Sequence, residues 1–322
     1  MKPFKSTMLI KTLTILVLFS FSHLGGISSR APAQSALPGH DPADVRWNRL
    51  IFKSGNFLGT VTTRVQIEEL AAEAIGDGLL ESPGSAGLEP EGAKAILLSV
   101  DSAMDPLFGS KEKMATRVWF SPQRTLALQR IRLRQGKEKW EKTYRWTPNG
   151  VYRRRLRPID ADEEQLPPTR WTDRQDSFYP YDLEAGNCAS VSEPSALLYA
   201  VSATGPAVGD PPTPLCVFNK KQLHLVRFTA AKSQHLKINY VVKSEGKESR
   251  RKGKAEVLKV SFTSRSLSAG KAEAEPFSFL GLKGDFDIFI DKRSKIPVQV
   301  SGRIPAFGRV DFKLGEVQLR LP

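Results

Sequence analysis

The sequence has few of the residues on which most enzymes and metal sites depend. Only four of its 322 residues are histidine and two are cysteine. The GxSxG, HExxH, Walker and dinucleotide-binding glycine motifs are all missing. His40 lies near the N-terminus, while His224 and His235 are expected on adjacent strands without a helical carboxylate partner. We therefore expect no catalytic residue, no metal site and no cofactor.

Long apolar runs are also missing, and the one notable run is near the N-terminus. After three lysines, residues 13–24 form an apolar stretch that is shorter than the roughly 20 residues needed to span a bilayer. The triplet at 31–33 has the small-x-small form that signal peptidase recognises. We predict a cleaved signal peptide at 1–33, a disordered leader at 34–44 and a periplasmic or otherwise extracytoplasmic protein without a transmembrane segment. The alternative is an uncleaved N-terminal anchor.

Acidic residues are too few to balance the basic ones. The chain has 48 Lys and Arg against 34 Asp and Glu, a formal charge of +14. The first 33 residues hold four basic residues and no acidic residue, so the rest of the chain keeps a net charge of +10. This excess favours an anionic partner, such as a lipid or an acidic polysaccharide. Nucleic acid is not expected, because the protein is predicted to be exported and has no recognisable nucleic-acid-binding motif.

The two cysteines, Cys188 and Cys216, both lie in the part of the chain expected to be exported. An oxidising compartment permits a disulfide there. The segment between them contains the Pro/Gly-rich run GPAVGDPPTP, and closing a loop of this length would stabilise the fold by about 3.5 kcal/mol. We predict a Cys188–Cys216 disulfide, with two free buried thiols or a metal pair as the alternatives.

From residue 45 onward the apolar residues recur with a period of two, which indicates β-strands. Strands are expected at 61–67, 94–101, 114–120, 124–134, 139–146, 151–157, 236–243, 286–290, 298–300 and 310–314. The parity of the apolar residues changes near Gln129, which indicates a β-bulge. The pattern predicts a mainly β fold with a large curved antiparallel sheet. This sheet would be a meander, open or half-barrel-like, with one or two short helices.

We expect residues 45–322 to form a single antiparallel β domain with two interruptions. Residues 69–91, rich in Ala, Gly, Glu and Pro, are predicted to be an insertion with a short helix and a mobile loop. Residues 159–186 are predicted to be a crossover between the first and second groups of strands.

Arginine recurs at alternate positions in two of the predicted strands. The two trios are Arg130, Arg132 and Arg134, and Arg153, Arg155 and Arg157. Alternation places each trio on one face of the sheet, with its members about 7 Å apart. Guanidinium groups at this spacing suit multivalent recognition of phosphate or carboxylate. The alternative is the solvated outer face of a basic protein. If the two strands flank residues 139–146, then Glu138, Glu141 and Arg145 would neutralise the patch or leave it open, depending on register.

Asp285 and Asp287 are the carboxylate pair that could carry out hydrolysis. Their i,i+2 spacing on one strand is compatible with polysaccharide cleavage. Solvent-facing alternation explains the pair equally well.

Three segments carry a family resemblance. They read IFKSGNFLGTVTTRVQI, PSALLYAVSATGPAVGD and GDFDIFIDKRSKIPVQVSGRIPAFGRVDFKL. The last one has a strand, an aspartate-containing turn, a Pro-Val start to the next strand and a glycine-containing turn into a final strand. In this order of features the chain resembles a bacterial envelope family known as domain of unknown function 3108. The resemblance implies an exported, mostly antiparallel β protein without an established activity, so no catalytic residue is carried over.

Together these features predict a non-enzymatic envelope protein. Its curved sheet would bind or chaperone an anionic or amphipathic ligand such as lipid, lipopolysaccharide or polysaccharide. The alternative is a structural or assembly adaptor for another envelope protein, with residues 69–91 as the docking element. A polysaccharide hydrolase is the third hypothesis.

The export signal gives a direct prediction. We expect the mature protein to begin at Gln34 or close to it, because the small-x-small triplet follows a short apolar run. N-terminal sequencing of native protein checks this. Intact Met1 in protein recovered from the cell envelope would contradict both cleavage and release from the membrane.

Overall fold

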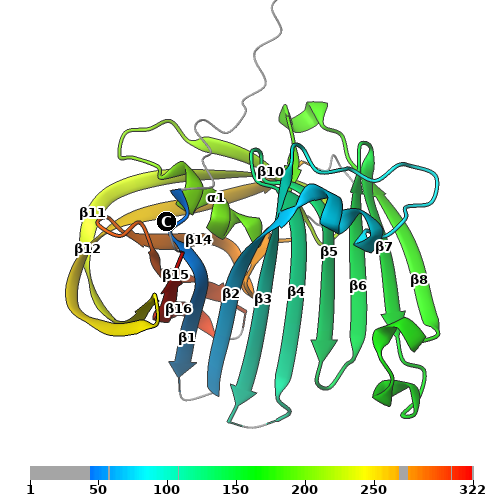
Figure 1. Cartoon of the computed structure of the whole chain (residues 1–322), viewed down its shortest axis with the longest axis horizontal. Coiled ribbons are helices and arrows are strands. Elements are labelled where there is room, and N and C mark those ends of the chain that lie inside the picture. The colour runs from blue at the N-terminus through cyan, green and yellow to red at the C-terminus, as the bar shows by residue number, and fades with distance from the viewer. Residues whose placement is uncertain (1–43, 57–58, 108, 268–274, 306, 321–322) are drawn as a thin grey trace, which may run out of the picture. The chain divides into compact units, whose positions relative to one another are not determined.

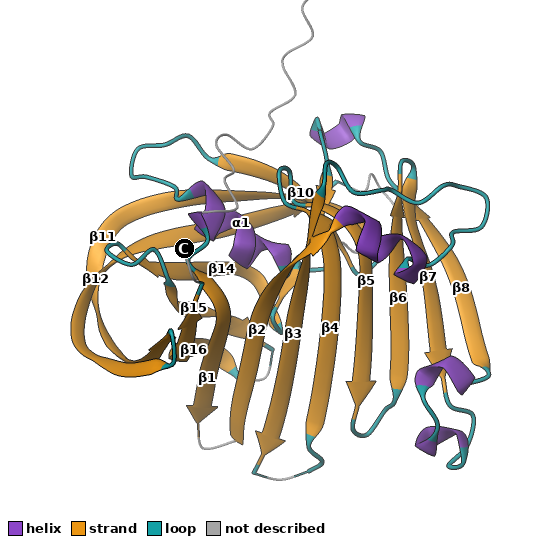
Figure 2. Ribbon diagram, in the orientation of Figure 1, coloured by secondary structure: helices purple, strands orange, loops and turns teal. Residues whose placement is uncertain are grey.

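The structure is a computed structural model that describes residues 44–320, apart from 57–58, 108, 268–274 and 306. The predicted signal peptide, the leader up to residue 43 and His40 lie outside the described residues. Figure 2 shows that strands dominate the described chain and that its helices are short. One curved sheet contains the strands, and all but two of its strand pairs are antiparallel. The mainly β fold predicted from the alternating pattern is therefore confirmed.

The first eight strands form an antiparallel meander in chain order (Figure 1). They are β1 (Trp47–Asn56), β2 (Gly59–Ala71), β3 (Lys94–Pro106), β4 (Glu112–Ser121), β5 (Leu126–Gln135), β6 (Trp140–Thr147), β7 (Gly150–Arg157) and β8 (Asp173–Pro180). The predicted β-bulge is present. Trp119 pairs with Gln129 but Phe120 pairs with Ala127, so Leu128 is the extra residue that changes the parity of β5.

Strand β8 lies inside the segment 159–186, which the sequence analysis assigned to a crossover. It pairs with β7 along its whole length and forms one edge of the sheet. Much of β8 is exposed, with no fully buried residue. An edge strand of this kind can be rich in polar residues, which explains why its sequence lacks the alternation that identifies the other strands.

The second half of the chain adds further strands and curls back on the sheet. They are β9 (Val191–Ser192), β10 (Thr213–Asn219), β11 (Gln222–Ser244), β12 (Lys247–Ser266), β13 (Ser278–Phe279), β14 (Leu282–Asp291), β15 (Pro297–Ile304) and β16 (Gly308–Leu319). Strand β16 pairs with β1, which joins this half to the meander. It also pairs with β11 at Val241–Lys243. The five strands β11, β12, β14, β15 and β16 therefore close into a ring, seen in the left half of Figure 1.

The main core lies between the meander and the ring. It contains the helix α1 (Ala196–Thr204), whose residues 196–203 are all buried, together with apolar residues of β1–β4 and of the ring. Tyr199 packs edge-on against Phe120 of β4, with ring centroids 5.0 Å apart. The indole N–H of Trp47 donates a hydrogen bond to Ser202 over 3.1 Å. We call the face of β1–β8 that contacts α1 and the ring the inner face.

The opposite, outer face is covered in part by residues 72–93. This segment begins with a 3₁₀ helix, consistent with the short helix predicted for the insertion. The side chain of Gln129 accepts a hydrogen bond from the backbone N–H of Leu80 over 2.6 Å. Arg145, which is 3% exposed, donates to the carbonyl oxygen of Leu88. The segment is thus attached to the sheet by two buried polar side chains.

The predicted disulfide between Cys188 and Cys216 is present. It ties the segment before β9 to β10, inside a second apolar cluster that includes Trp146 and Phe218. Closing this loop stabilises the fold by about 3.5 kcal/mol on the chain-entropy estimate.

One prediction about the histidines was wrong. His224 and His235 lie on the same strand, β11, because this strand runs on through an irregularity between Ala230 and Ser233. Burial, and then the charge of Lys220, lowers the pKa of His224 to about 4. Within the described part of the chain, no group of three or more His, Cys, Asp or Glu side chains could hold a metal ion. Nor does any helix there have the length and apolarity needed to cross a membrane.

Candidate anion-binding site

Both arginine trios lie on the inner face of the sheet, on β5 and β7. Arg130 is opposite Val118, a core residue of β4, in the β4–β5 register. Alternate residues of a strand share a face, so Arg132 and Arg134 point the same way. Strand β6 lies between β5 and β7. The register of β6 therefore determines which of its side chains lie between the two trios.

Three cations form a row across these strands. Arg132 of β5 is opposite Lys142 of β6, which is opposite Arg155 of β7. We call these three residues the cation row. Neighbouring strands lie about 4.8 Å apart, and like charges directly opposite each other repel. No carboxylate of the described residues lies within ion-pair distance of any of the three.

Two residues of the cation row, Arg132 and Lys142, contact the Trp140 ring, and the Arg132 guanidinium also lies 3.9 Å from the sulfur of Met114. The ammonium group of Lys142 lies 4.1 Å from the centre of the Trp140 ring, and the Arg132 guanidinium lies 5.7 Å from it. The Nε of Arg155 is buried without a hydrogen-bond partner among the described residues. Burial, followed by the charges of three neighbouring arginines, lowers the pKa of Lys142 to about 8. The local environment therefore disfavours positive charge that no anion balances.

Arg130 is two residues before Arg132 on β5, and it has a buried counter-charge. Its Nη1 lies 3.1 Å from Oε1 of Glu193, and each side chain is 3% exposed. The guanidinium also lies 4.1 Å from the centre of the Tyr144 ring. Glu193 precedes α1, and its other oxygen accepts a hydrogen bond from the backbone N–H of Ser195 over 2.6 Å. This ion pair fixes the start of α1 against the inner face.

Three further arginines of the trios, Arg134, Arg153 and Arg157, have polar partners. Arg134 forms ion pairs with Glu112 and Glu138, both at 3.0 Å. Arg157 donates two hydrogen bonds to one oxygen of Asp173. Arg153 donates to the hydroxyl of Ser177 over 3.0 Å and lies over the Tyr179 ring. Of the six predicted residues, only Arg132 and Arg155 have no ion pair or hydrogen bond to an oxygen atom among the described residues.

A cavity of about 390 Å³ adjoins the cation row at Arg132. One wall is the inner face of β2–β5, and the other consists of the segment before α1, the β10–β11 and β13–β14 turns, and β15–β16. Its apolar lining residues are Val61, Val100, Met104, Met114, Pro194, Leu280, Ile304 and Phe312. On the sheet side, Arg130 and Arg132 come from β5, whereas the apolar side chains come from β2–β4. The opposite wall adds two charged residues, Glu193, which is paired with Arg130, and Lys220.

Asp285 and Asp287 do not form part of this site. Asp285 is exposed. Asp287 is largely buried and accepts hydrogen bonds from Ser261 and Arg309 over 2.8 and 2.9 Å. It also lies 3.3 Å from the ammonium group of Lys259. Its carboxylate is therefore already occupied by partners within the protein.

Sequence reasoning missed Lys142 and Glu193. Lys142 is on the same face of β6 as Trp140 and Tyr144. The alternation of β6 could therefore have predicted that Lys142 faces the arginines, had the pairing of β6 with β5 and β7 been known. Of the three residues considered for neutralising the patch, Glu138 pairs with Arg134, whereas Glu141 and Arg145 have the opposite parity to Lys142. Glu193 lies 63 residues from Arg130 in the chain, and no local pattern links the two.

Comparisons with known proteins identify no family. No family model matches the chain, and no curated protein matches it. Among solved structures, it is similar to a beta-barrel-like protein of domain of unknown function DUF1849 from Brucella abortus. The TM-score is 0.40 with 8% sequence identity, over 86% of this chain and 99% of that chain. The resemblance to domain of unknown function 3108 stays a prediction.

The buried Arg130–Glu193 pair gives a stability prediction. Glu193→Gln leaves the Arg130 guanidinium buried without a counter-charge, which should lower the free energy of unfolding by about 3–5 kcal/mol. The double variant Arg130→Met/Glu193→Leu removes both charges and should recover most of this loss. Urea unfolding of the wild type, the single variant and the double variant gives the free energy of unfolding of each. Glu138→Gln, which breaks an exposed pair worth about 0–1 kcal/mol, is the control, and an equal effect of the two single substitutions would contradict the prediction.

Proposed function

We propose that this protein is a non-enzymatic envelope protein that binds an anionic amphiphile. The anionic group lies on the cation row, and the apolar part extends into the adjoining cavity. The observation that carries this proposal is the cation row itself, three positive charges in register without a carboxylate partner among the described residues.

The chemistry of the cation row suits a carboxylate or phosphate. Guanidinium groups donate paired hydrogen bonds that match the oxygen atoms of these anions. Two arginines flank the Lys142 ammonium, so an anion there would meet donors from three strands at once. Binding would also relieve the repulsion among the three cations. Partial burial strengthens each interaction relative to one in open water.

The cavity suits the apolar part of the same ligand. Its volume of about 390 Å³ lies within the range of about 300–1,000 Å³ typical of small-molecule sites. Two methionines, Met104 and Met114, line it, and flexible thioether side chains adapt to varied apolar shapes. Fatty acids, lipids and lipopolysaccharide all combine such an apolar part with an anionic group. An acidic polysaccharide would use the cation row alone.

The compartment belongs to the proposal. A disulfide between Cys188 and Cys216 is consistent with an oxidising environment. The predicted signal peptide and the resemblance to domain of unknown function 3108 both favour the envelope. We therefore place the proposed ligand among the amphiphiles and polymers found outside the cytoplasm.

The two other hypotheses have less support. An adaptor role was attributed to residues 69–91, but residues 72–93 are attached to their own sheet through Gln129 and Arg145. A hydrolase role relied on Asp285 and Asp287, and the second carboxylate is engaged by Arg309 and Lys259. Neither feature offers an unpartnered group comparable to the cation row.

Removing the cation row should abolish most of the binding. The triple variant Arg132→Gln/Lys142→Met/Arg155→Gln should bind dodecanoate, below its critical micelle concentration, at least about tenfold more weakly. The reason is that hydrogen bonds to charged groups contribute about 1.5–3 kcal/mol each. Isothermal titration calorimetry at low salt measures the change. Because the substitutions remove repulsion, the thermal unfolding midpoint should not fall.

A matched control removes the same charge from elsewhere. Lys53→Met/Arg64→Gln/Lys113→Gln takes three exposed cations from the outer face of the meander. This variant should bind dodecanoate as the wild type does. Equal weakening in both triple variants would show that net charge alone attracts the ligand, and unchanged affinity in the first would contradict a role for the cation row.

A further inference from the structure

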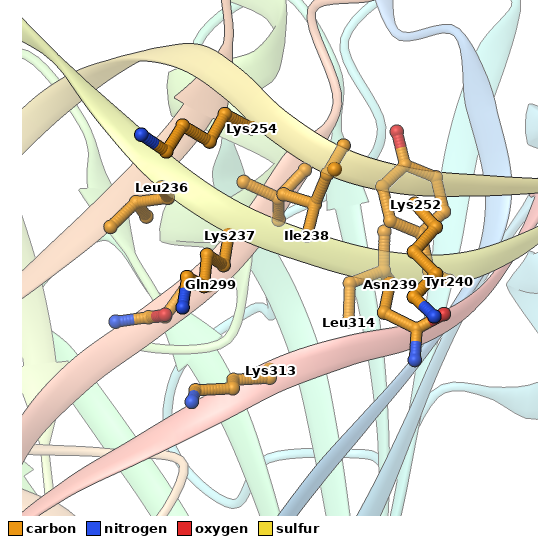
Figure 3. A pocket seen from close by; sticks show the side chains of 12 residues that line it. Leu236, Lys237, Ile238, Asn239, Tyr240, Lys252, Lys254, Gln299, Lys313 and Leu314 are labelled. Atoms are coloured by element: carbon orange, nitrogen blue, oxygen red, sulfur yellow. The ribbon is translucent and has the colours of Figure 1, made fainter.

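A second cavity, of about 520 Å³, lies in the ring, away from the cation row. Strand β11 pairs with β16 only at Val241–Lys243, opposite Glu316–Gln318. Strand β15 begins to pair with β16 at Gln299, opposite Lys313. Between these two points β11 and β16 separate, and the cavity occupies the space between them (Figure 3).

Four lysines line this cavity: Lys237, Lys252, Lys254 and Lys313. We call it the lysine groove. Lys237 is directly opposite Lys254 in the β11–β12 register. In Figure 3, the side chain of Lys237 extends from β11 toward Gln299, and Gln299 is opposite Lys313 in the β15–β16 register. Like charges opposite each other on neighbouring strands are destabilising. All four lysines are exposed, so water and salt screen much of this repulsion, and a bound anion would offset what is left.

The lining has no negative charge to offset these lysines. No Asp or Glu is among its residues, and none of the four lysines forms an ion pair with another described residue. Other lysines of the same strands do have partners: Lys243 with Glu316, and Lys259 with Asp287. The groove is thus a place where the ring leaves positive charge unbalanced.

The groove also has an apolar floor. Leu236, Ile238, Tyr240, Val298 and Leu314 line it together with the lysines. Tyr240 and Leu314 are almost fully buried, at 1% and 3% exposed. A ligand there would meet apolar side chains beneath and ammonium groups around its anionic end.

We propose that the lysine groove is a binding site for a phosphate group carried on an apolar substituent. Lysine ammonium groups act as compact point charges on flexible stems, so several of them can converge on a tetrahedral dianion without the planar fit that arginine requires. The apolar floor then distinguishes a phosphate ester from free phosphate. The inference is independent of the proposed function, because no residue of the groove belongs to the cation row or to its cavity.

Hexyl phosphate and inorganic phosphate are the two probes. Wild-type protein should bind hexyl phosphate more tightly than inorganic phosphate, because only the ester reaches the apolar floor. The variant Lys237→Gln/Lys252→Gln/Lys254→Gln/Lys313→Gln should lose at least about tenfold in affinity for hexyl phosphate. Calorimetric titration at two salt concentrations measures both, and the affinity should fall as salt rises. Binding of dodecanoate at the cation row should be unchanged in this variant, which separates failure of one proposal from failure of the other.

Two further variants test whether the effect comes from the groove or from net charge. The control Lys113→Gln/Lys137→Gln/Lys221→Gln/Lys232→Gln removes four exposed lysines that do not line the groove, and it should bind hexyl phosphate as the wild type does. Lys313→Glu places a carboxylate in the groove without altering the core, and it should weaken binding of hexyl phosphate as strongly as the quadruple variant.

The results distinguish a site for a phosphate ester from a site for free phosphate. If both probes bind equally and both are lost in the quadruple variant, the groove is a site for free phosphate and the ester proposal is overturned. Equal losses in the quadruple variant and its control would also overturn the proposal, because they would reflect net charge. So would unchanged affinity in the quadruple variant.

Discussion

The curling of one antiparallel sheet is the constraint on which the rest of the structure depends. The inner face of β1–β8 is turned toward α1 and the ring, so many side chains that β1–β7 direct to this face are withdrawn from water. Large apolar side chains such as Trp47, Phe120 and Trp146 occupy much of this face. Strand alternation sends Arg130 and Lys142 to the same face, and positive charge is therefore held where solvation is poor.

Whether a cation on the inner face has a carboxylate partner depends on its position on that face. Arg130 is deepest and has a buried partner in Glu193, while Arg134 has carboxylates at the margin of the sheet. The cation row lies between them with aromatic contacts and no carboxylate. Donors already held in place lose little conformational entropy when a ligand arrives, so such a row favours anion binding. The lysine groove follows the same electrostatic logic with more flexible groups.

Much of this fold could be predicted because alternation is a local property of the sequence. The strands, the β-bulge beside Gln129 and the common face of each arginine trio all follow from parity. Strand β8 was missed because an edge strand can be polar. The contact of Arg130 with Glu193, and the meeting of Lys237 with Lys313 in one cavity, depend on pairing between distant segments. Local patterns carry no information about such pairing, so neither the buried counter-charge nor the lysine groove was predicted.

The pKa of Lys142 is the most direct measure of whether the cation row holds positive charge that no anion balances. Selective ¹³C labelling of lysine side chains, with Lys142→Met to assign the resonance, allows the amine to be titrated by nuclear magnetic resonance. We expect a pKa of about 8 in the free protein, because burial and three neighbouring arginines disfavour the ammonium form. Saturating dodecanoate should raise it, since a bound anion favours that form. An ordinary lysine pKa of about 10.4 that dodecanoate leaves unchanged would show that the cation row is not an anion-binding site.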